Sequence, residues 1–320
     1  MKKIAVLTSG GDAPGMNAAI RSVVRTAIYY GLEVYGIERG FLGLMNDEIL
    51  PMDRTSVGNI LQRGGTILRT ARAEEFKTHE GQKKAVEVIS KRGIEGLVVI
   101  GGDGSFRGAH VLDSKWGIPT IAVPATIDND IGGTDYSIGF DTAVNTVINA
   151  INNIKDTASS HDRVFIIQVM GRNAGHLALL ASLAGGAEVV ILPEVEFDIN
   201  EICKKIVQGK ERGKLHSIVL VAEGVGSAYG IGDLIAHKIK YETRIIVLGH
   251  LQRGGSPTAF DRILASKMGY AAVLALMEGE RDKMVGIVGN KVVLSPIETA
   301  WKEKKELDQE IYKINEILAM

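Results

Sequence analysis

The chain has 320 residues, 45% of them hydrophobic and 23% charged, with a formal net charge of −1 at pH 7. This length is enough for two globular domains, and a nearly neutral chain lacks the strong positive field that attracts nucleic acid or membrane surfaces nonspecifically. A single cysteine, Cys203, excludes an internal disulfide and a cysteine-rich metal site, and it fits a reducing compartment.

The first predicted elements are a strand, a glycine-rich loop and a helix. Residues 4–7 are apolar, residues 8–15 read Thr-Ser-Gly-Gly-Asp-Ala-Pro-Gly, and residues 16–30 place apolar side chains on one helical face. The loop lacks the closing lysine of a Walker A motif and the glycine spacing of a dinucleotide fingerprint. Its composition indicates a loop that faces phosphate, and the alternative is a tight turn between strand and helix.

The sequence gives no sign of a signal peptide or a membrane span. Its apolar start is too short for a signal peptide, and no run approaches the roughly 20 apolar residues that cross a bilayer. We therefore expect a cytoplasmic protein whose partners are neither nucleic acid nor membrane.

Arginines stand at two places in the next part of the chain. Arg21 and Arg25 lie four residues apart on the predicted helix and so share a face, which is usually a solvated surface. Residues 63–72 read Arg-Gly-Gly-Thr-Ile-Leu-Arg-Thr-Ala-Arg. These glycines and basic side chains suggest a second loop that faces phosphate.

Two apolar runs, residues 96–100 and 120–123, each end in a polar cluster. The first cluster, residues 101–105, reads Gly-Gly-Asp-Gly-Ser, and reacting groups collect outside the carboxyl ends of parallel strands. Glycines let backbone N–H groups approach phosphate oxygens, and Mg²⁺ favours one or two carboxylates together with substrate phosphates. Because Asp103 would repel a pyrophosphate without an intervening cation, this half indicates a nucleotide with a metal rather than a nicotinamide cofactor.

The second cluster places Asp128 and Asp130 two residues apart after a buried strand. A carboxylate between a sugar hydroxyl and a nucleotide γ-phosphate would serve as base, and phosphoryl transfer otherwise needs mostly positioning and charge neutralisation. The alternative is a turn built on Asx hydrogen bonds.

The second half repeats the alternation, with strands expected at residues 164–169, 189–192, 217–222 and 244–248. Arg172 follows the first of these strands and could neutralise a phosphoryl group or make an ordinary surface ion pair. His250 follows the last and could be a buried, satisfied histidine. One half is thus equipped for a nucleotide and metal, the other for a compact anion. The alternation predicts an α/β fold of two doubly wound, Rossmann-like lobes with parallel sheets.

Seven motifs together resemble the bacterial ATP-dependent 6-phosphofructokinase family over nearly the whole length. They are TSGGDAPGMNAAIR from Thr8, RGGT from Arg63, VVIGGDGS from Val98, TIDNDI from Thr126, MGR from Met170, AEGVG from Ala222 and LGHLQRGGSPTAFDR from Leu248. The resemblance implies the phosphofructokinase fold and a glycolytic kinase that phosphorylates fructose 6-phosphate with ATP. The alternatives are a pyrophosphate-dependent phosphofructokinase and a catalytically silent regulator that binds ATP and a sugar phosphate. A nucleotide or lipid kinase sharing the GGDG turn would lack the motifs of the second half.

The resemblance also implies roles for individual residues. Asp128 would take the proton from the sugar 1-hydroxyl, Asp103 would hold Mg²⁺, and the transfer would be supported by Thr126, Asp130, Arg172 and Gly11. ATP would contact Gly11, Arg72, Gly102, Asp103, Gly104 and Ser105. Fructose 6-phosphate would contact Thr126, Asp128, Met170, Gly171, Arg172, Glu223, His250 and Arg253, with Arg163 and Arg244 from a neighbouring subunit. Sites shared by two chains imply an obligate oligomer, and the family's pattern is a homotetramer.

The family's effector site lies between subunits and accepts ADP as activator or phosphoenolpyruvate as inhibitor. The matching positions are Arg21, Arg25, Arg54, Lys155, Glu188, Arg212 and Lys214. This chain departs from common family residues at Lys155, often an arginine, whose replacement by lysine loses a bidentate fork, and at Leu215, often a second lysine.

Other departures concern the nucleotide. Ala125 replaces a usual glycine, Phe41 stands where a tyrosine often stacks on adenine, and His176 replaces a frequent aspartate. Pyrophosphate-dependent relatives carry aspartate at the position of Gly104 and lysine at that of Ala125. Since both residues are small here, the expected donor is ATP.

The resemblance divides the chain into two lobes. Residues 1–138 plus 252–304 would form the lobe that binds ATP and Mg²⁺, and residues 139–251 plus 305–320 the lobe that binds fructose 6-phosphate.

Overall fold

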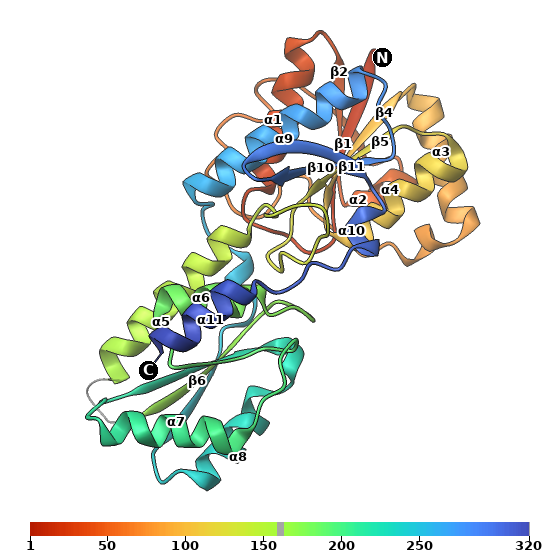
Figure 1. Cartoon of the computed structure of the whole chain (residues 1–320). Helices are drawn as coiled ribbons and strands as arrows, with labels where there is room; N and C mark the ends of the chain where they lie inside the picture. Colours follow the sequence, from red (N-terminus) through yellow and green to blue (C-terminus); the bar gives the residue numbers. More distant parts are fainter. Residues whose placement is uncertain (159–162, 320) are drawn as a thin grey trace. The chain divides into compact units, whose positions relative to one another are not determined.

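The computed structural model describes residues 1–158 and 163–319, which divide into two compact units (Figure 1). Unit 1 comprises Met1–Thr126, Ile131–Asp141 and Arg253–Lys305, and unit 2 comprises Ile127–Asp130, Thr142–Gln252 and Glu306–Met320. These divisions fall close to those that the family resemblance suggests. The assignment of one ligand to each lobe stays a prediction.

Within the described residues, the sheet of unit 1 has seven strands in the order β11-β10-β5-β4-β1-β2-β3. Its central strands are parallel and buried on both faces, which suits their nearly continuous apolar runs. Each edge strand is antiparallel to its neighbour: β3 pairs with β2, and β11 pairs with β10. The strands are β1 (Lys3–Ser9), β2 (Glu33–Ile37), β3 (Ile49–Met52), β4 (Gly96–Gly101), β5 (Thr120–Pro124), β10 (Lys283–Val288) and β11 (Lys291–Pro296).

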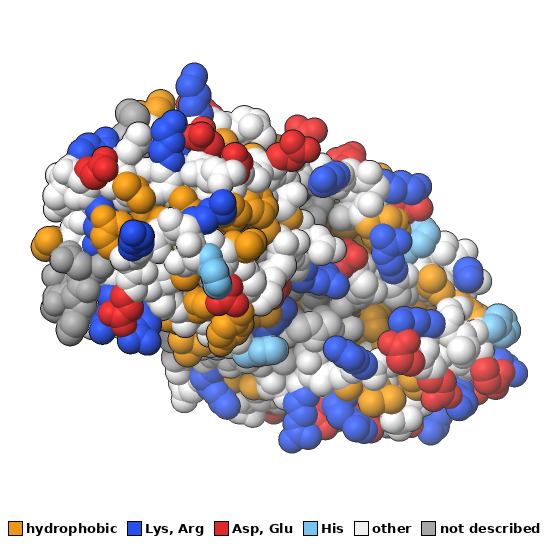
Figure 2. Space-filling model, turned by 90° about the horizontal axis from the view of Figure 1, so that it is seen from below, with side chains coloured by type: hydrophobic (Ala, Val, Ile, Leu, Met, Phe, Trp, Pro, Cys, Tyr) orange, Lys and Arg blue, Asp and Glu red, His pale blue; other side chains and the backbone are white. Residues whose placement is uncertain are grey.

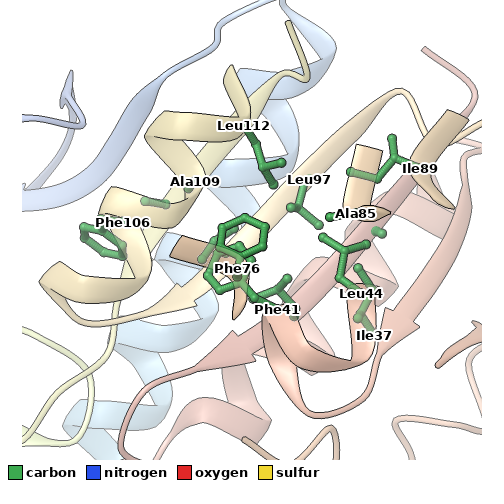
Figure 3. Packing of buried hydrophobic residues seen from close by; sticks show 14 of the residues in the cluster. Ile37, Phe41, Leu44, Phe76, Ala85, Ile89, Leu97, Phe106, Ala109 and Leu112 are labelled. Carbon is green, nitrogen blue, oxygen red and sulfur yellow. The ribbon is translucent and has the colours of Figure 1, made fainter. Parts of the chain in front are cut away.

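Helices cover both faces of this sheet. Helices α1 (Met16–Tyr29) and α9 (Ala259–Met277) pack against each other on one face. The other face carries α2 (Gly40–Met45), α3 (His79–Arg92), α4 (Asp103–Trp116), α10 (Thr299–Lys302) and the short η1 (Glu74–Lys77). On that side, Phe41 and Phe76 stack with ring centroids 4.3 Å apart inside a cluster of buried side chains (Figure 3).

Unit 2 has a smaller sheet of four parallel strands in the order β7-β8-β6-β9 within the residues described. The strands are β6 (Val164–Val169), β7 (Val189–Ile191), β8 (Ser217–Ala222) and β9 (Thr243–Val247). The helices are α5 (Phe140–Ala158), α6 (His176–Gly185), α7 (Ile199–Glu211), η2 (Glu223–Val225), α8 (Ala228–Lys238), η3 (Gly249–Arg253), which ends one residue inside unit 1, and α11 (Gln309–Leu318). A second cluster of buried side chains forms the core between this sheet and α7 and α8.

The predicted fold class is confirmed, with local differences. A hairpin joins β10 to β11 through Gly289 and Asn290, whose φ angles of 55° and 66° are those of a two-residue turn between antiparallel strands. The sequence analysis did not predict this hairpin, and it overlooked α2, β3 and α8. Among the described helices, none is both long and apolar enough to span a bilayer.

The strand order reverses once in each unit. The chain continues from β1 to β2 on one side and later to β4 on the other, so the order reverses beside β1. In unit 2 the corresponding strand is β6, which lies between β8 and β9. Ligands of open α/β sheets bind outside the carboxyl ends of strands at such a reversal.

Candidate active site

Three strands of unit 1 end at the same level, which brings their following loops together. In the register, Ser9 of β1 lies opposite Gly101 of β4, and Gly101 lies opposite Pro124 of β5. A Cβ atom on Gly101 would lie 2.4 Å from the Ser9 carbonyl oxygen and 2.6 Å from Ser105 Oγ. Only glycine allows this approach, so loops 10–15 and 102–105 share one edge of the sheet.

Asp103 is the first residue of α4, with Gly102 as N-cap. The first N–H groups of a helix have no acceptor within it, and the helix dipole favours an anion beside them. A Cβ atom on Gly104 would meet nothing within 4 Å among the described residues, which leaves room beside the first turn.

The described residues contain no cluster of three or more His, Cys, Asp or Glu side chains that would hold a metal by itself. A cation beside α4 would therefore share Asp103 with oxygens of its ligand. That donor set is the one that Mg²⁺ prefers at phosphate sites.

Loop 63–72 is fastened to the start of α1 by the Asn17 side chain. Its Nδ2 donates to the carbonyl oxygens of Arg63 and Gly64, each at 3.1 Å, and its Oδ1 accepts from the Ile67 N–H at 2.8 Å. The side chain is 1% exposed. The sequence analysis overlooked this residue because its partners are backbone atoms about 50 positions away.

Arg253 lies against the first glycine loop. Its Nη1 donates to the Asp12 carbonyl oxygen at 3.1 Å, and a Cβ atom on Gly11 would lie 2.4 Å from that nitrogen. Unit 1 thus brings together Gly11, predicted to contact ATP, and Arg253, predicted to contact fructose 6-phosphate. Arg72, also predicted to contact ATP, is exposed.

The segment after β5 carries the predicted base. Thr126 follows the strand and is 8% exposed, and Asp128, two residues further on, is buried. Asn129 has a φ of 53°, a left-handed conformation that asparagine tolerates better than most residues. The backbone therefore turns sharply between Asp128 and Asp130.

The strand ends of unit 2 are tied together by two side chains. The Glu223 carboxylate accepts from the Arg172 N–H at 2.7 Å and from the Gly171 N–H at 3.2 Å. Gln252 accepts from the Met170 N–H at 3.1 Å and is fully buried. Sequence reasoning assigned Glu223 to substrate and overlooked both anchoring roles.

The two basic side chains of these strand ends, Arg172 and His250, reach solvent. Arg172 has a left-handed φ of 53° and is exposed, so the anchored loop presents its side chain outward. His250, in η3, is exposed as well. The alternative of a buried, satisfied histidine is therefore wrong.

Arg163 and Arg244 lie at the opposite end of the unit 2 sheet. Both pair with Glu242, Arg163 through Nε at 2.8 Å, and these arginines, Arg163 first, lower the pKa of the Glu242 carboxyl. Arg163 precedes the six residues of β6, a length of roughly 20 Å at about 3.3 Å per residue, and Arg244 of β9 lies opposite Phe165, the second residue of β6. Unit 2 thus groups these two arginines and holds them away from Arg172.

Four predicted effector residues belong to unit 2. Glu188, Arg212 and Lys214 line a cavity of about 400 Å³. Lys214 Nζ lies 3.7 Å from Glu188 Oε1 and donates to the Ala319 carbonyl oxygen at 3.3 Å. Lys155 donates to the carbonyl oxygens of Gly185 at 2.7 Å and Gly186 at 3.0 Å.

The other three predicted effector residues belong to unit 1. Arg21 and Arg25 share a face of α1, where burial and then the neighbouring charge of Arg25 lower the pKa of the Arg21 guanidinium. Arg54 follows β3 in a turn that the Asp53 carboxylate organises by accepting from the N–H groups of Thr55 and Ser56, each at 2.8 Å. The Thr55 hydroxyl, which donates to the same carboxylate at 2.6 Å, and then these N–H groups lower the pKa of Asp53 to about 2.

The surface carries charges of both signs. Figure 2 shows lysine and arginine side chains interspersed with aspartate and glutamate over the face drawn. Anion binding therefore depends on local groups such as those above, as the small net charge of the sequence predicts.

The chain resembles known proteins over its full length. A family profile described as "Phosphofructokinase" matches residues 3–276. The ATP-dependent 6-phosphofructokinases of Halothermothrix orenii and Thermoanaerobacter sp. (strain X514) are 58% and 59% identical, with 100% of each chain covered. Among solved structures, phosphofructokinase from Saccharomyces cerevisiae is 34% identical with a TM-score of 0.90; the alignment covers 100% of this chain and 48% of the yeast chain.

Proposed function

The chain belongs to the phosphofructokinase family, and we infer that it phosphorylates fructose 6-phosphate with ATP at the 1-hydroxyl group. The products are fructose 1,6-bisphosphate and ADP, and the reaction is a step of glycolysis. The observation that carries the assignment to particular residues is the level ending of β1, β4 and β5, because it joins two glycine loops to the segment that leads into Asp128.

In the proposed mechanism, Asp128 takes the proton of the sugar 1-hydroxyl as its oxygen forms a bond to the γ-phosphorus. The bond from that phosphorus to the β,γ-bridging oxygen breaks, and ADP leaves. Thr126, Asp130 and Arg172 would support the transfer, Arg172 by offsetting the negative charge of the phosphoryl group. Such a reaction depends mainly on positioning and charge neutralisation.

We assign the nucleotide to the edge of unit 1. Backbone N–H groups of loops 10–15 and 102–105 would hold its phosphates, as glycine loops at helix starts do elsewhere. Asp103 would hold Mg²⁺ together with phosphate oxygens, and the ion would supply charge neutralisation when bound. Pyrophosphate-dependent relatives carry an aspartate at the position of Gly104. The open space beside Gly104 in this chain supports ATP rather than pyrophosphate as the phosphoryl donor.

We assign the sugar phosphate to the strand ends of unit 2, with the side chains of Met170, Arg172, Glu223 and His250. Arg163 and Arg244 lie near the opposite end of this sheet, Arg163 roughly 20 Å away along β6, which supports the proposal that they serve a neighbouring subunit. A site completed in this way makes the active form an oligomer, proposed to be a homotetramer.

We further propose that ADP and phosphoenolpyruvate regulate the enzyme through the seven effector residues and that it works in the cytoplasm. The cavity beside Glu188, Arg212 and Lys214 supports the first proposal. The second is supported by the glycolytic reaction, whose substrates are soluble phosphates.

The test is steady-state phosphorylation of fructose 6-phosphate with Mg²⁺, using ATP and pyrophosphate as donors in parallel titrations. We expect activity with ATP and none with pyrophosphate. Activity with pyrophosphate alone would overturn the donor assignment, and no activity with either donor would favour a silent binding protein.

A further inference from the structure

We propose that Ser137 is a positioning residue of phosphoryl transfer, and that Asp261 holds Ser137 in place. The inference rests on the proposed role of Asp128 as base and goes beyond it. It concerns the backbone that leads into that residue. All of the contacts that carry it lie within unit 1.

The key contact is a short hydrogen bond inside the fold. Ser137 Oγ donates to the Thr126 carbonyl oxygen at 2.6 Å, and Ser137 is 0% exposed. Atoms from Thr126 Cα to Ile127 Cα form one planar peptide unit. Fixing the direction of that carbonyl therefore fixes the plane from which Ile127, and then Asp128, departs.

Residues 137–139 lie beside the end of β5 like a short extra strand. Ile138 N–H donates to the Pro124 carbonyl oxygen at 3.0 Å, and Ala125 N–H donates to the Gly101 carbonyl oxygen at 2.9 Å. These backbone bonds set the height of Thr126 relative to β4. Ser137 Oγ adds a side-chain hydrogen bond to the carbonyl oxygen of Thr126 itself.

A buried carboxylate secures the other end of this segment. Asp261 Oδ1 accepts from the Gly139 N–H at 2.8 Å, and Asp261 is 0% exposed. Gly139 has a φ of 101°, and a Cβ atom there would lie 2.7 Å from Ala13 Cβ. Both the backbone conformation and the limited space at residue 139 require glycine.

Asp261 itself is fixed by the start of α9. Thr258 caps the helix, accepting from the Asp261 N–H at 3.3 Å, and its hydroxyl donates to Asp141 Oδ2 at 2.6 Å. A carboxylate in the first turn of a helix is also favoured by the helix dipole. Residues at the start of α9 thus hold this segment at Gly139 and at Asp141.

The functional consequence follows from the sensitivity of transfer reactions to geometry. A misplacement of about 1 Å can lower a rate by roughly 100-fold. Asp128 is separated from the Ser137 bond by one intervening residue, Ile127. Loss of the hydroxyl should therefore reduce turnover while leaving the glycine loops proposed to hold ATP intact.

The main experiment compares Ser137→Ala with wild type as full-length chains. We expect kcat to fall roughly 10- to 100-fold, with KM for ATP changed by less than about 2-fold, because the glycine loops proposed to hold the nucleotide are unaltered. The matched control is Ser182→Ala, since Ser182 is also 0% exposed and its hydroxyl has no hydrogen-bond partner among the described residues. The control should keep the wild-type kcat.

A second pair of variants protects the test against misfolding. Asp261→Asn keeps an oxygen that can accept from Gly139 N–H and should retain most of the wild-type kcat. Asp261→Ala loses this acceptor and should show the same fall in kcat as Ser137→Ala. A merely structural role would lower the unfolding midpoint of Asp261→Ala without this separation of kcat from KM.

Wild-type kcat in folded Ser137→Ala, or equal kcat in both Asp261 variants, would overturn the inference. A wild-type chain that fails to phosphorylate fructose 6-phosphate would instead overturn the proposed function. The two failures are therefore distinguishable in one set of assays.

Discussion

The two units build anion sites from different materials. Unit 1 ends its strands in glycine loops that expose backbone N–H groups, with the Asp103 carboxylate at the start of α4. Unit 2 ends its strands in exposed basic side chains, Arg172 on a loop held by Glu223 and His250 in η3. The difference matches the proposed ligands, because a phosphate chain with a cation suits N–H groups and a carboxylate, whereas a compact sugar phosphate needs cations from the protein.

The anchors of these loops differ as well. In unit 1 the anchoring side chains are those of Asn17, Ser137 and Asp261, and each is at most 1% exposed. Asn17 and Asp261 form hydrogen bonds with backbone groups distant in the sequence, and Ser137 forms one with the backbone of Thr126, just after β5. In unit 2, Glu223 and Gln252 stand at the strand ends themselves and bond the adjacent loop. Substitutions in the two units should therefore have different effects on kcat and on the KM values for the two substrates.

The largest effect is expected at the base. Asp128→Ser should lower kcat about 1,000-fold or more, since a positioned base contributes roughly 10²- to 10⁴-fold. Affinity for fructose 6-phosphate should change little, because the cations that hold it remain. The assay is steady-state turnover, with Asp233→Ser, an exposed aspartate of α8, as control. Near-normal turnover would remove Asp128 from the role of base.

The next effect concerns sites shared between chains. Arg163→Ala should raise KM for fructose 6-phosphate roughly 10- to 100-fold, the range expected for losing a hydrogen bond to a charged group. Co-refolding equal amounts of this variant and Asp128→Ser should restore about a quarter of wild-type turnover. Each shared site needs an intact Asp128 from one chain and an intact Arg163 from its neighbour, and each of these is present in half of the chains when they pair at random.

This mixing experiment is measured at a fructose 6-phosphate concentration where neither variant alone is active. Each variant refolded by itself is the control. Activity that stays at the sum of the separate variants would contradict a site shared by two chains.

A smaller effect is expected at the unit 1 anchor. Asn17→Ala should reduce the free energy of unfolding by about 1–3 kcal/mol, because backbone groups of loop 63–67 lose buried partners. KM for ATP should rise while kcat at saturation stays close to wild type. Urea unfolding and ATP titration measure the two quantities, and the exposed Asn152→Ala is the control. An unchanged unfolding midpoint would show that Asn17 does not hold this loop.

The smallest effect on the unliganded enzyme is expected at Lys214. Lys214→Ala removes a cation of the 400 Å³ cavity and should abolish the response to ADP and phosphoenolpyruvate while basal kcat is retained. Lys204→Ala, an exposed lysine of α7, serves as control. A full effector response in Lys214→Ala would place the effector site elsewhere.

Most of the site loops could be predicted because each begins directly after an apolar run in the sequence. Residues 96–100 and 164–169 are such runs, and the glycines after them left little alternative to a loop. The β10–β11 hairpin also had a signal, Gly289-Asn290 between apolar runs, which the sequence analysis passed over.

The anchors were not predictable in the same way. Ser137, Gln252 and Asp261 resemble ordinary polar residues in sequence, and their partners are backbone atoms fixed only by the tertiary fold. Asp261, for example, bonds a residue 122 positions away. No local pattern distinguishes such a residue from a solvated helix position.

The central claim, that unit 1 serves the donor and unit 2 the acceptor, is tested most directly by measuring both KM values in two variants. Gly104→Asp fills the open space beside α4 and should raise KM for ATP about 10-fold or more while KM for fructose 6-phosphate stays near wild type. Arg244→Ala should raise KM for fructose 6-phosphate while KM for ATP stays near wild type. Variants that shift both KM values equally, or that exchange these effects, would contradict the account.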